Sequence, residues 1–94
     1  MSSNAYNSKR NWEVLLHPEV DAWLDAQSDL DYSLIRDALE ALHIAGPSLG
    51  RPFVDRLKGS KFHNLKELRP RGSQIRLLFA FDPERWAIIL VAGD

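Results

Sequence analysis

The chain of 94 residues contains no cysteine. Disulfide frameworks, thiolate catalysis and zinc sites built on cysteine are therefore excluded. Long hydrophobic runs are also missing: the longest, at residues 86–92, is far shorter than the roughly 20 residues needed to cross a bilayer. Residues 1–11 are polar and offer no apolar stretch that could serve as a signal peptide. We therefore expect a cytoplasmic protein with no membrane association.

The sequence also lacks the motifs of several common enzyme classes. It has no glycine-rich dinucleotide loop, no Walker-type phosphate loop, no HExxH zinc motif and no GxSxG nucleophile elbow. Its three histidines, His17, His43 and His63, fall in different predicted elements with no cluster of carboxylates beside them. We therefore expect neither a metal site nor a cofactor. His43 is expected to stabilise the C-terminus of a helix, where a cation is favoured.

Charge is divided unevenly along the chain. The length allows one domain with a single two-layer core, which we place at residues 12–94, after a flexible tail at 1–11. The formal net charge is only −1, yet residues 1–50 hold three basic residues against eight acidic ones, and residues 51–85 hold nine against four. Such asymmetry indicates a surface that meets a polyanion. A basic face that only balances acidic helices explains it equally well.

The first half of the sequence predicts a strand followed by a helical hairpin. The strand is expected at residues 12–17, and a short helix over about 18–27 begins with a proline, which suits a first helical turn. Asp29 or Asp31 can cap a second helix, whose apolar side chains recur at helical spacing. That helix is expected to stop at Gly46-Pro47.

The second half predicts a loop and then three strands. Residues 47–63 contain two prolines and two glycines, and we interpret them as a long loop with room for one short turn of order. Strands are expected at about 65–70, 74–82 and 85–92. The predicted fold class is therefore α+β, with the order β-α-α-β-β-β. An N-terminal strand and a helical hairpin pack on a small antiparallel sheet.

The register of the last two strands is inferred from a two-residue loop at Pro83-Glu84, inside a tight-turn sequence. Three pairs of side chains then face the helices: Phe81 with Trp86, Phe79 with Ile88, and Leu77 with Leu90. The opposite face is expected to carry the remaining side chains of these strands: Arg76, Leu78, Ala80, Ala87, Ile89 and Val91.

Two arginines are expected to meet on that opposite face. Arg69 lies across the preceding hairpin from Arg76, so both side chains project on the same side of the sheet. Like charges directly opposite each other lower the stability of a sheet. The arrangement therefore points to an anion between the two guanidinium groups.

Basic residues cluster around this pair in the sequence: Arg56, Lys58, Lys61, His63, Lys66, Arg69, Arg71 and Arg76. Such a set can cleave RNA without a metal. The ribose 2′-hydroxyl attacks the adjacent phosphate, a lysine or histidine accepts its proton, and arginines stabilise charge on the phosphoryl oxygens. Binding of phosphate or of an acidic protein requires the same residue types without special geometry. The residues alone favour this simpler reading.

Three segments resemble the RelE/ParE toxin superfamily, and most closely its HigB-like branch of phage-derived Gp49-like proteins. They are NLKELR at 64–69, RLLFAFDP at 76–83 and IILVAGD at 88–94. The resemblance extends over nearly the whole chain from Trp12 and includes the Gly-Arg-Pro loop at 50–52. It implies a bacterial type II toxin that cleaves mRNA, usually in the ribosomal A site.

The resemblance also implies partners. A cognate antitoxin, typically a helix-turn-helix DNA-binding protein, neutralises such a toxin, and the complex represses its own operon. Operator DNA is then reached only through the antitoxin.

The resemblance assigns roles to individual residues. Arg69 and Arg76 match arginines expected to bind and stabilise the scissile phosphate, and Lys66 matches a lysine expected to contact the RNA backbone. His63 is a candidate for proton transfer, although a solvent-facing histidine at the sheet edge is equally consistent with its position. The remaining basic positions are expected to bind RNA: Arg56, Lys58, Lys61 and Arg71.

One departure from the family pattern leaves alternatives open. Members of this branch usually continue beyond the position of Asp94 into a C-terminal helix, which we expect this domain to lack. One alternative function is inhibition of DNA gyrase by a ParE-like protein. The other is a truncated, catalytically inactive form that still binds its antitoxin.

Overall fold

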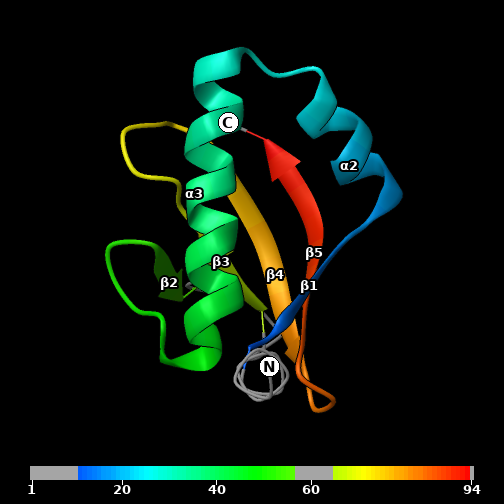
Figure 1. Cartoon of the computed structure of the whole chain (residues 1–94), viewed down its shortest axis with the longest axis vertical. Helices are drawn as coiled ribbons and strands as arrows, with labels where there is room; N and C mark the ends of the chain where they lie inside the picture. Colours follow the sequence, from blue (N-terminus) through cyan, green and yellow to red (C-terminus); the bar gives the residue numbers. More distant parts are fainter. Residues whose placement is uncertain (1–10, 57–64, 94) are drawn as a thin grey trace, which may run out of the picture.

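Five strands form a single sheet in the computed structural model, which describes residues 11–56 and 65–93 (Figure 1). Their order across the sheet is β1-β5-β4-β3-β2. The strands are β1 (Glu13–Leu16), β2 (Val54–Arg56), β3 (Leu65–Leu68), β4 (Arg76–Asp82) and β5 (Trp86–Gly93). Neighbouring strands run antiparallel except β1, which lies parallel to β5 at one edge. The sheet is therefore mixed rather than purely antiparallel.

Two helices follow β1, as the sequence predicts: α2 (Pro18–Asp25) and α3 (Asp29–Ala45). The side chain of His17 caps α2 by accepting a hydrogen bond from the Glu19 N–H. Ser28, rather than either predicted aspartate, caps α3 by accepting from the Asp31 N–H at 3.2 Å. The two aspartates lie in the first turn instead, where their negative charge interacts favourably with the positive end of the helix dipole. Helix α3 ends at Gly46, which has a positive φ of 57°, as expected.

The long loop predicted at residues 47–63 is wrong in part. A short 3₁₀ helix, η1 (Gly46–Ser48), continues the end of α3 and agrees with the short turn of order expected in this segment. The departure is β2, which adds an edge strand to β3. Three residues in the middle of a Pro- and Gly-rich segment carry too weak a pattern to predict a strand. Their pairing with β3 decides their conformation. Residues 57–63 lie outside the described part of the chain.

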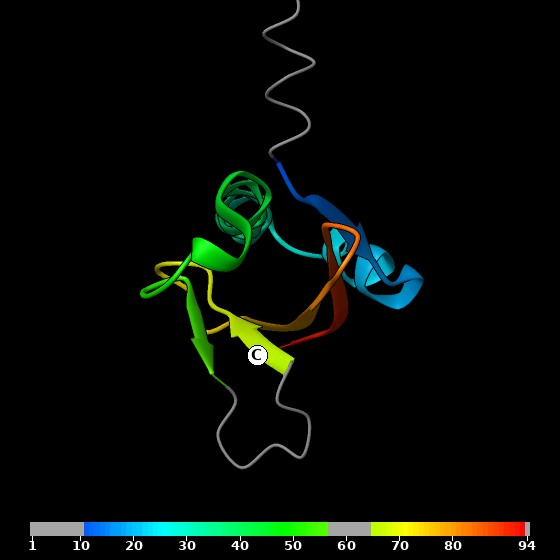
Figure 2. The same cartoon turned by 90° about the horizontal axis from the view of Figure 1, so that it is seen from below.

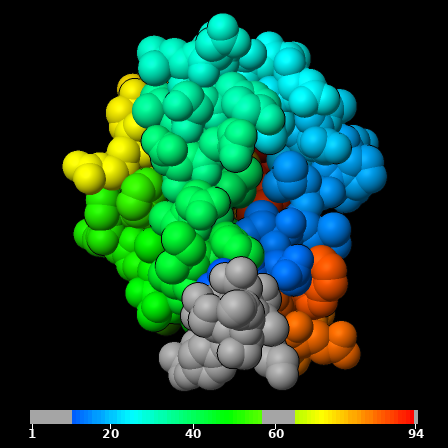
Figure 3. All heavy atoms as spheres, viewed as in Figure 1, coloured from blue at the N-terminus to red at the C-terminus, as the bar shows by residue number. Residues whose placement is uncertain are grey.

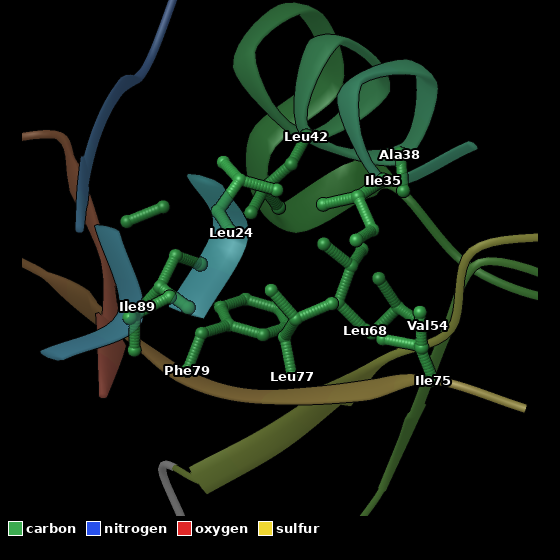
Figure 4. Packing of buried hydrophobic residues seen from close by; sticks show 12 residues of the cluster. Leu24, Ile35, Ala38, Leu42, Val54, Leu68, Ile75, Leu77, Phe79 and Ile89 are labelled. Atoms are coloured by element: carbon green, nitrogen blue, oxygen red, sulfur yellow. The ribbon is translucent and has the colours of Figure 1, made fainter. Parts of the chain in front are cut away.

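Both helices lie on the concave side of the curved sheet (Figure 2). Between the two layers is one apolar core (Figure 4). Helix α3 contributes Ile35, Ala38 and Leu42, whereas β4 contributes Leu77 and Phe79. The predicted assignment of β4 is therefore confirmed for these two residues. We call the opposite side of the sheet, which α2 and α3 do not cover, the open face.

The predicted register between β4 and β5 is wrong. Asp82 pairs with Trp86, so the loop contains three residues rather than two. Its last residue, Arg85, has a φ of 72°, which matches the three-residue hairpin loop that ends in a left-handed residue. The extra residue moves the side chains of residues 86–89 in β5 to the other face. Ala87 and Ile89, predicted on the open face, are consequently buried in the core.

A bulge later in β5 reverses this shift. Phe79 pairs with Ile89, but Leu78 pairs with Val91, so Leu90 is the additional residue. Leu90 is 40% exposed rather than covered by the helices as predicted. Beyond the bulge, Ala92 pairs with Leu77 and packs against the core, and Val91 pairs with Leu78 on the open face, where the sequence places it. The three-residue loop and the bulge at Leu90 therefore determine which face each residue of β5 occupies. Neither is marked by a glycine in the sequence.

His43 fixes β1 to α3. Its ring Nδ1 lies 2.6 Å from the carbonyl oxygen of Trp12, and its own carbonyl oxygen accepts a hydrogen bond from the Trp12 N–H at 2.9 Å. The predicted position in the last turn of the helix is confirmed. The indole of Trp12 also packs edge-on against Phe81 and lies beneath the guanidinium group of Arg85.

The observed register predicts opposite effects from two adjacent substitutions. Ile89→Ala should lower the free energy of unfolding by about 2–5 kcal/mol, because it opens a cavity in the core. Leu90→Ala should cost about 1 kcal/mol or less, because much of that side chain is already in water. Urea denaturation followed by circular dichroism measures both values. A larger loss of unfolding free energy for Leu90→Ala than for Ile89→Ala would contradict the observed register and support the two-residue loop.

Two glycines with positive φ test the packing of Trp12. A Cβ at Gly46 would overlap the indole of Trp12, whereas a Cβ at Gly72 (φ 79°) meets nothing within 4 Å. Gly72→Ala should therefore cost only the penalty of the backbone conformation, about 1–2 kcal/mol. Gly46→Ala should cost measurably more in the same denaturation experiment. Equal losses would mean that Trp12 moves aside freely.

Candidate phosphate-binding site on the open face

A carboxylate links the two arginines that the sequence places together. The Oε1 atom of Glu67 lies 3.0 Å from Nε of Arg69, and its Oε2 atom lies 3.5 Å from Nη1 of Arg76. The anion expected between the arginines is therefore supplied by the protein itself. Sequence reasoning missed this residue, although its spacing of two from Arg69 already indicates a shared face on a strand.

Strand alternation explains why these three side chains meet. Leu68 is fully buried in the core, so its neighbours Glu67 and Arg69 project from the open face. Glu67 pairs with Leu78 across the sheet, and Arg76 is two residues from Leu78 on the same side of β4. Arg69 directly follows β3. Its backbone N–H donates a hydrogen bond to the carbonyl oxygen of Phe53 at 2.6 Å, which extends the pairing of β3 with β2 by one residue.

Asp55 and Arg51 extend the cluster. Asp55 pairs with Glu67 across β2 and β3, and its Oδ2 lies 4.0 Å from Nη1 of Arg69. Its Oδ1 accepts a hydrogen bond from Nη2 of Arg51 at 3.3 Å. The resulting row of alternating charge, which we call the charge row, consists of Arg51, Asp55, Arg69, Glu67 and Arg76.

The pKa of Asp55 is lowered below its ordinary value of 3.8. The main cause is the hydrogen bond that the backbone N–H of Arg56 donates to its Oδ1 at 2.8 Å, and the charge of Arg51 acts in the same direction. Partial desolvation of the carboxyl opposes both effects. Asp55 is therefore ionised at neutral pH.

The arginines of the charge row remain accessible to a ligand. The side chain of Glu67 is only 11% exposed, whereas those of Arg69 and Arg76 are 41% and 53% exposed. Each guanidinium carries five N–H donors, and Glu67 engages one nitrogen of each. Planar guanidinium groups match the oxygens of a phosphate. The open face therefore offers two oriented cations at one place.

The other predicted site residues do not all join this pair. Lys66 pairs with both Phe79 and Arg56, so strand alternation places Lys66 and Arg56 toward the other face, at the β2–β3 edge. Arg71 is exposed in the turn between β3 and β4. Lys58, Lys61 and His63 lie outside the described residues.

No group of three or more metal-binding side chains occurs within residues 11–56 and 65–93. His17 and His43 each hold local structure, as described above. The same residues contain no helix that is long and apolar enough to span a membrane.

A hollow lies on the helix side of the molecule, between α3 and β1 (Figure 3). Its volume is about 320 Å³. Glu13, Glu40 and Arg36 contribute its charged groups, and Val14 and Leu39 are among its apolar residues. Acidic groups predominate over basic ones here, so this hollow is a poorer match to a phosphate than the charge row.

Comparisons with known proteins agree with the fold and the motifs. The family described as "Phage derived protein Gp49-like (DUF891)" matches residues 22–94. Two curated proteins of Mycobacterium tuberculosis (strain ATCC 25618 / H37Rv) are similar in sequence. "Putative toxin HigB3" is 49% identical over 81 residues, which is 86% of this chain and 71% of that protein. "Putative toxin HigB2" is 47% identical over 78 residues, and the match spans 80% of this chain but only 39% of that protein.

A solved structure shares the fold. It is the crystal structure of the archaeal RelE–RelB complex from Pyrococcus horikoshii OT3, with a TM-score of 0.66 and 20% sequence identity. The alignment covers 87% of this chain and 92% of that chain. At this identity, the likeness concerns the arrangement of helices and strands.

Asp55 should titrate below pH 3.8 when its carboxyl carbon is followed by NMR. A folded-state pKa below the unfolded value means that the ionised group stabilises the fold. This contribution is complete above the unfolded pKa and is lost as the pH falls through the folded one. Arg51→Gln should raise the Asp55 pKa only partly, because the backbone hydrogen bond persists. A full return to 3.8 would make Arg51 the main cause.

Proposed function

This chain belongs to the Gp49-like family within the RelE/HigB superfamily of toxin–antitoxin toxins, and we propose that it is a metal-independent endoribonuclease acting on mRNA. The observation that carries the proposal is the pair of exposed guanidinium groups, Arg69 and Arg76, held on the open face by one buried carboxylate. Arg69 and Arg76 lie within two of the three sequence segments that carry the family resemblance.

The proposed reaction uses the RNA as its own nucleophile. The ribose 2′-oxygen forms a bond to the adjacent phosphorus, and the bond from phosphorus to the 5′-oxygen breaks. The 2′-hydroxyl gives up one proton to the proton-transfer residue, and the leaving 5′-oxygen takes up one from that residue or from water. The products are a 2′,3′-cyclic phosphate and a 5′-hydroxyl group. Arg69 and Arg76 bind the non-bridging oxygens and stabilise the negative charge that develops on them.

Proton transfer requires a different group. Arginine stays protonated in proteins, so neither member of the pair can accept the proton of the 2′-hydroxyl. His63 is the proposed proton-transfer residue, because an imidazole changes its charge near neutral pH. Lys66, Arg56 and Arg71, together with Lys58 and Lys61, are proposed to contact the RNA backbone beyond the scissile phosphate.

The proposed partners follow from the family. The similar fold of the RelE–RelB complex supports a cognate antitoxin for this chain, which we propose is a helix-turn-helix protein that alone contacts operator DNA. The proposed substrate is mRNA bound to a translating ribosome in the cytoplasm.

Arg69→Ala and Arg76→Ala should each slow cleavage by roughly 100-fold or more, as loss of a transition-state charge stabiliser does. Primer extension on mRNA in a translation extract, with and without active ribosomes, measures the cuts. Arg36→Ala is the matched control, because it removes the same charge from an exposed position on α3 and should cut like the wild type.

Thermal unfolding of each variant distinguishes lost catalysis from lost fold. Wild-type activity in either arginine variant would contradict the roles proposed for the pair. The absence of cuts by the wild-type chain would contradict the nuclease itself. Gyrase inhibition would then support the ParE-like alternative, and tight antitoxin binding without toxicity would support the inactive form.

A further inference from the structure

Glu67 is an unexpected residue at the centre of a proposed phosphate site. Its carboxylate lowers the formal charge of the three-residue cluster with Arg69 and Arg76 from +2 to +1, and it repels the phosphate that the arginines attract. A buried carboxylate is also costly unless its charge is compensated. Glu67 is the only charged residue of the described chain that is buried. Neither property helps an RNA to bind.

The geometry indicates what Glu67 provides instead. Its two oxygens engage different arginines, one through Nε of Arg69 and the other through Nη1 of Arg76. The two guanidinium groups, which come from different strands, are thereby held at a fixed separation. Long arginine side chains without such a partner sample many rotamers. The burial of Glu67 keeps the bridging carboxylate itself in one position.

We propose that Glu67 is a positioning residue for cleavage, which holds Arg69 and Arg76 in the geometry that stabilises the transition state while weakening the binding of intact RNA. The proposal rests on the nuclease function proposed above. Catalysis gains only from interactions that are stronger in the transition state than in the bound substrate. A carboxylate that repels the phosphate at all stages, yet orients two donors toward the developing charge, has this effect.

The proposal predicts that binding and cleavage respond in opposite directions to Glu67→Gln. The variant removes one negative charge from the site, so an RNA analogue with a 2′-deoxy residue at the cut should bind several-fold more tightly. Its affinity should also fall more steeply with salt, because more unneutralised charge meets the RNA. Single-turnover cleavage should slow by roughly 10–100-fold, because displaced catalytic groups lose rate on this scale.

Two further variants separate charge from position. Glu67→Asp keeps the charge but shortens the side chain by one methylene, so it cannot bridge both arginines as before. It should slow cleavage without tightening RNA binding. Glu84→Gln makes the same change in net charge as Glu67→Gln at an exposed turn between β4 and β5. It should cleave like the wild type, which excludes net charge as the cause of slower cleavage.

Fluorescence anisotropy with the uncleavable RNA, single-turnover kinetics on cleavable mRNA and thermal unfolding are measured for the full chain and each variant. Tighter binding with slower cleavage by a folded Glu67→Gln variant supports the proposal. Wild-type cleavage rates in both Glu67 variants would overturn it, as would a proportional loss of binding and cleavage. If the wild-type protein cleaves no RNA, the proposed nuclease function itself is wrong. If the wild-type protein cleaves RNA and both Glu67 variants cleave it at the same rate, the nuclease function stands and the positioning role of Glu67 is wrong.

Discussion

Strand β4 has to satisfy two environments at once, and the rest of the molecule follows from this constraint. Leu77 and Phe79 are buried beneath the helices, whereas Arg76 is exposed on the other side of the sheet. Because side chains alternate along a strand, the same backbone that anchors the core also aims an arginine at the open face. A shift of one residue in β4 would turn Arg76 toward the core and turn Leu77 and Phe79 toward the open face. The proposed site is therefore fixed by hydrophobic packing as much as by its own ion pairs.

The alternation of β4 and the two amphipathic helices could be predicted from the sequence, because each rests on a local and repeated pattern. The faces of β5 could not. Its apolar run gives no alternation, so its register depends on the length of the turn after Asp82. The sequence Asp-Pro-Glu-Arg fits a two-residue loop as well as the observed three-residue loop, in which Arg85 takes a positive φ without being a glycine. The bulge at Leu90 then depends on tertiary pairing and has no signature of its own.

The candidate site shows the same division. The meeting of Arg69 and Arg76 could be predicted, since both follow from strand alternation across a short turn. The bridging contacts of Glu67 could not be predicted, because a charged residue in a strand is usually solvated and only the structure shows that Glu67 is buried. Lys66 illustrates a different difficulty. Its sequence position next to Glu67 suggests a shared site, yet adjacent residues of a strand project to opposite faces.

The alternating charges of the charge row have a consequence for specificity as well as for orientation. A uniformly basic surface binds any polyanion through counterion release, with little regard to geometry. Here Asp55 and Glu67 neutralise part of the attraction while leaving N–H donors of Arg69 and Arg76 accessible. Non-specific attraction is thereby reduced more than directional hydrogen bonding to a phosphate that fits between the donors. In the proposed function, this arrangement would let a small domain with a net charge of −1 select for phosphate geometry rather than for negative charge alone.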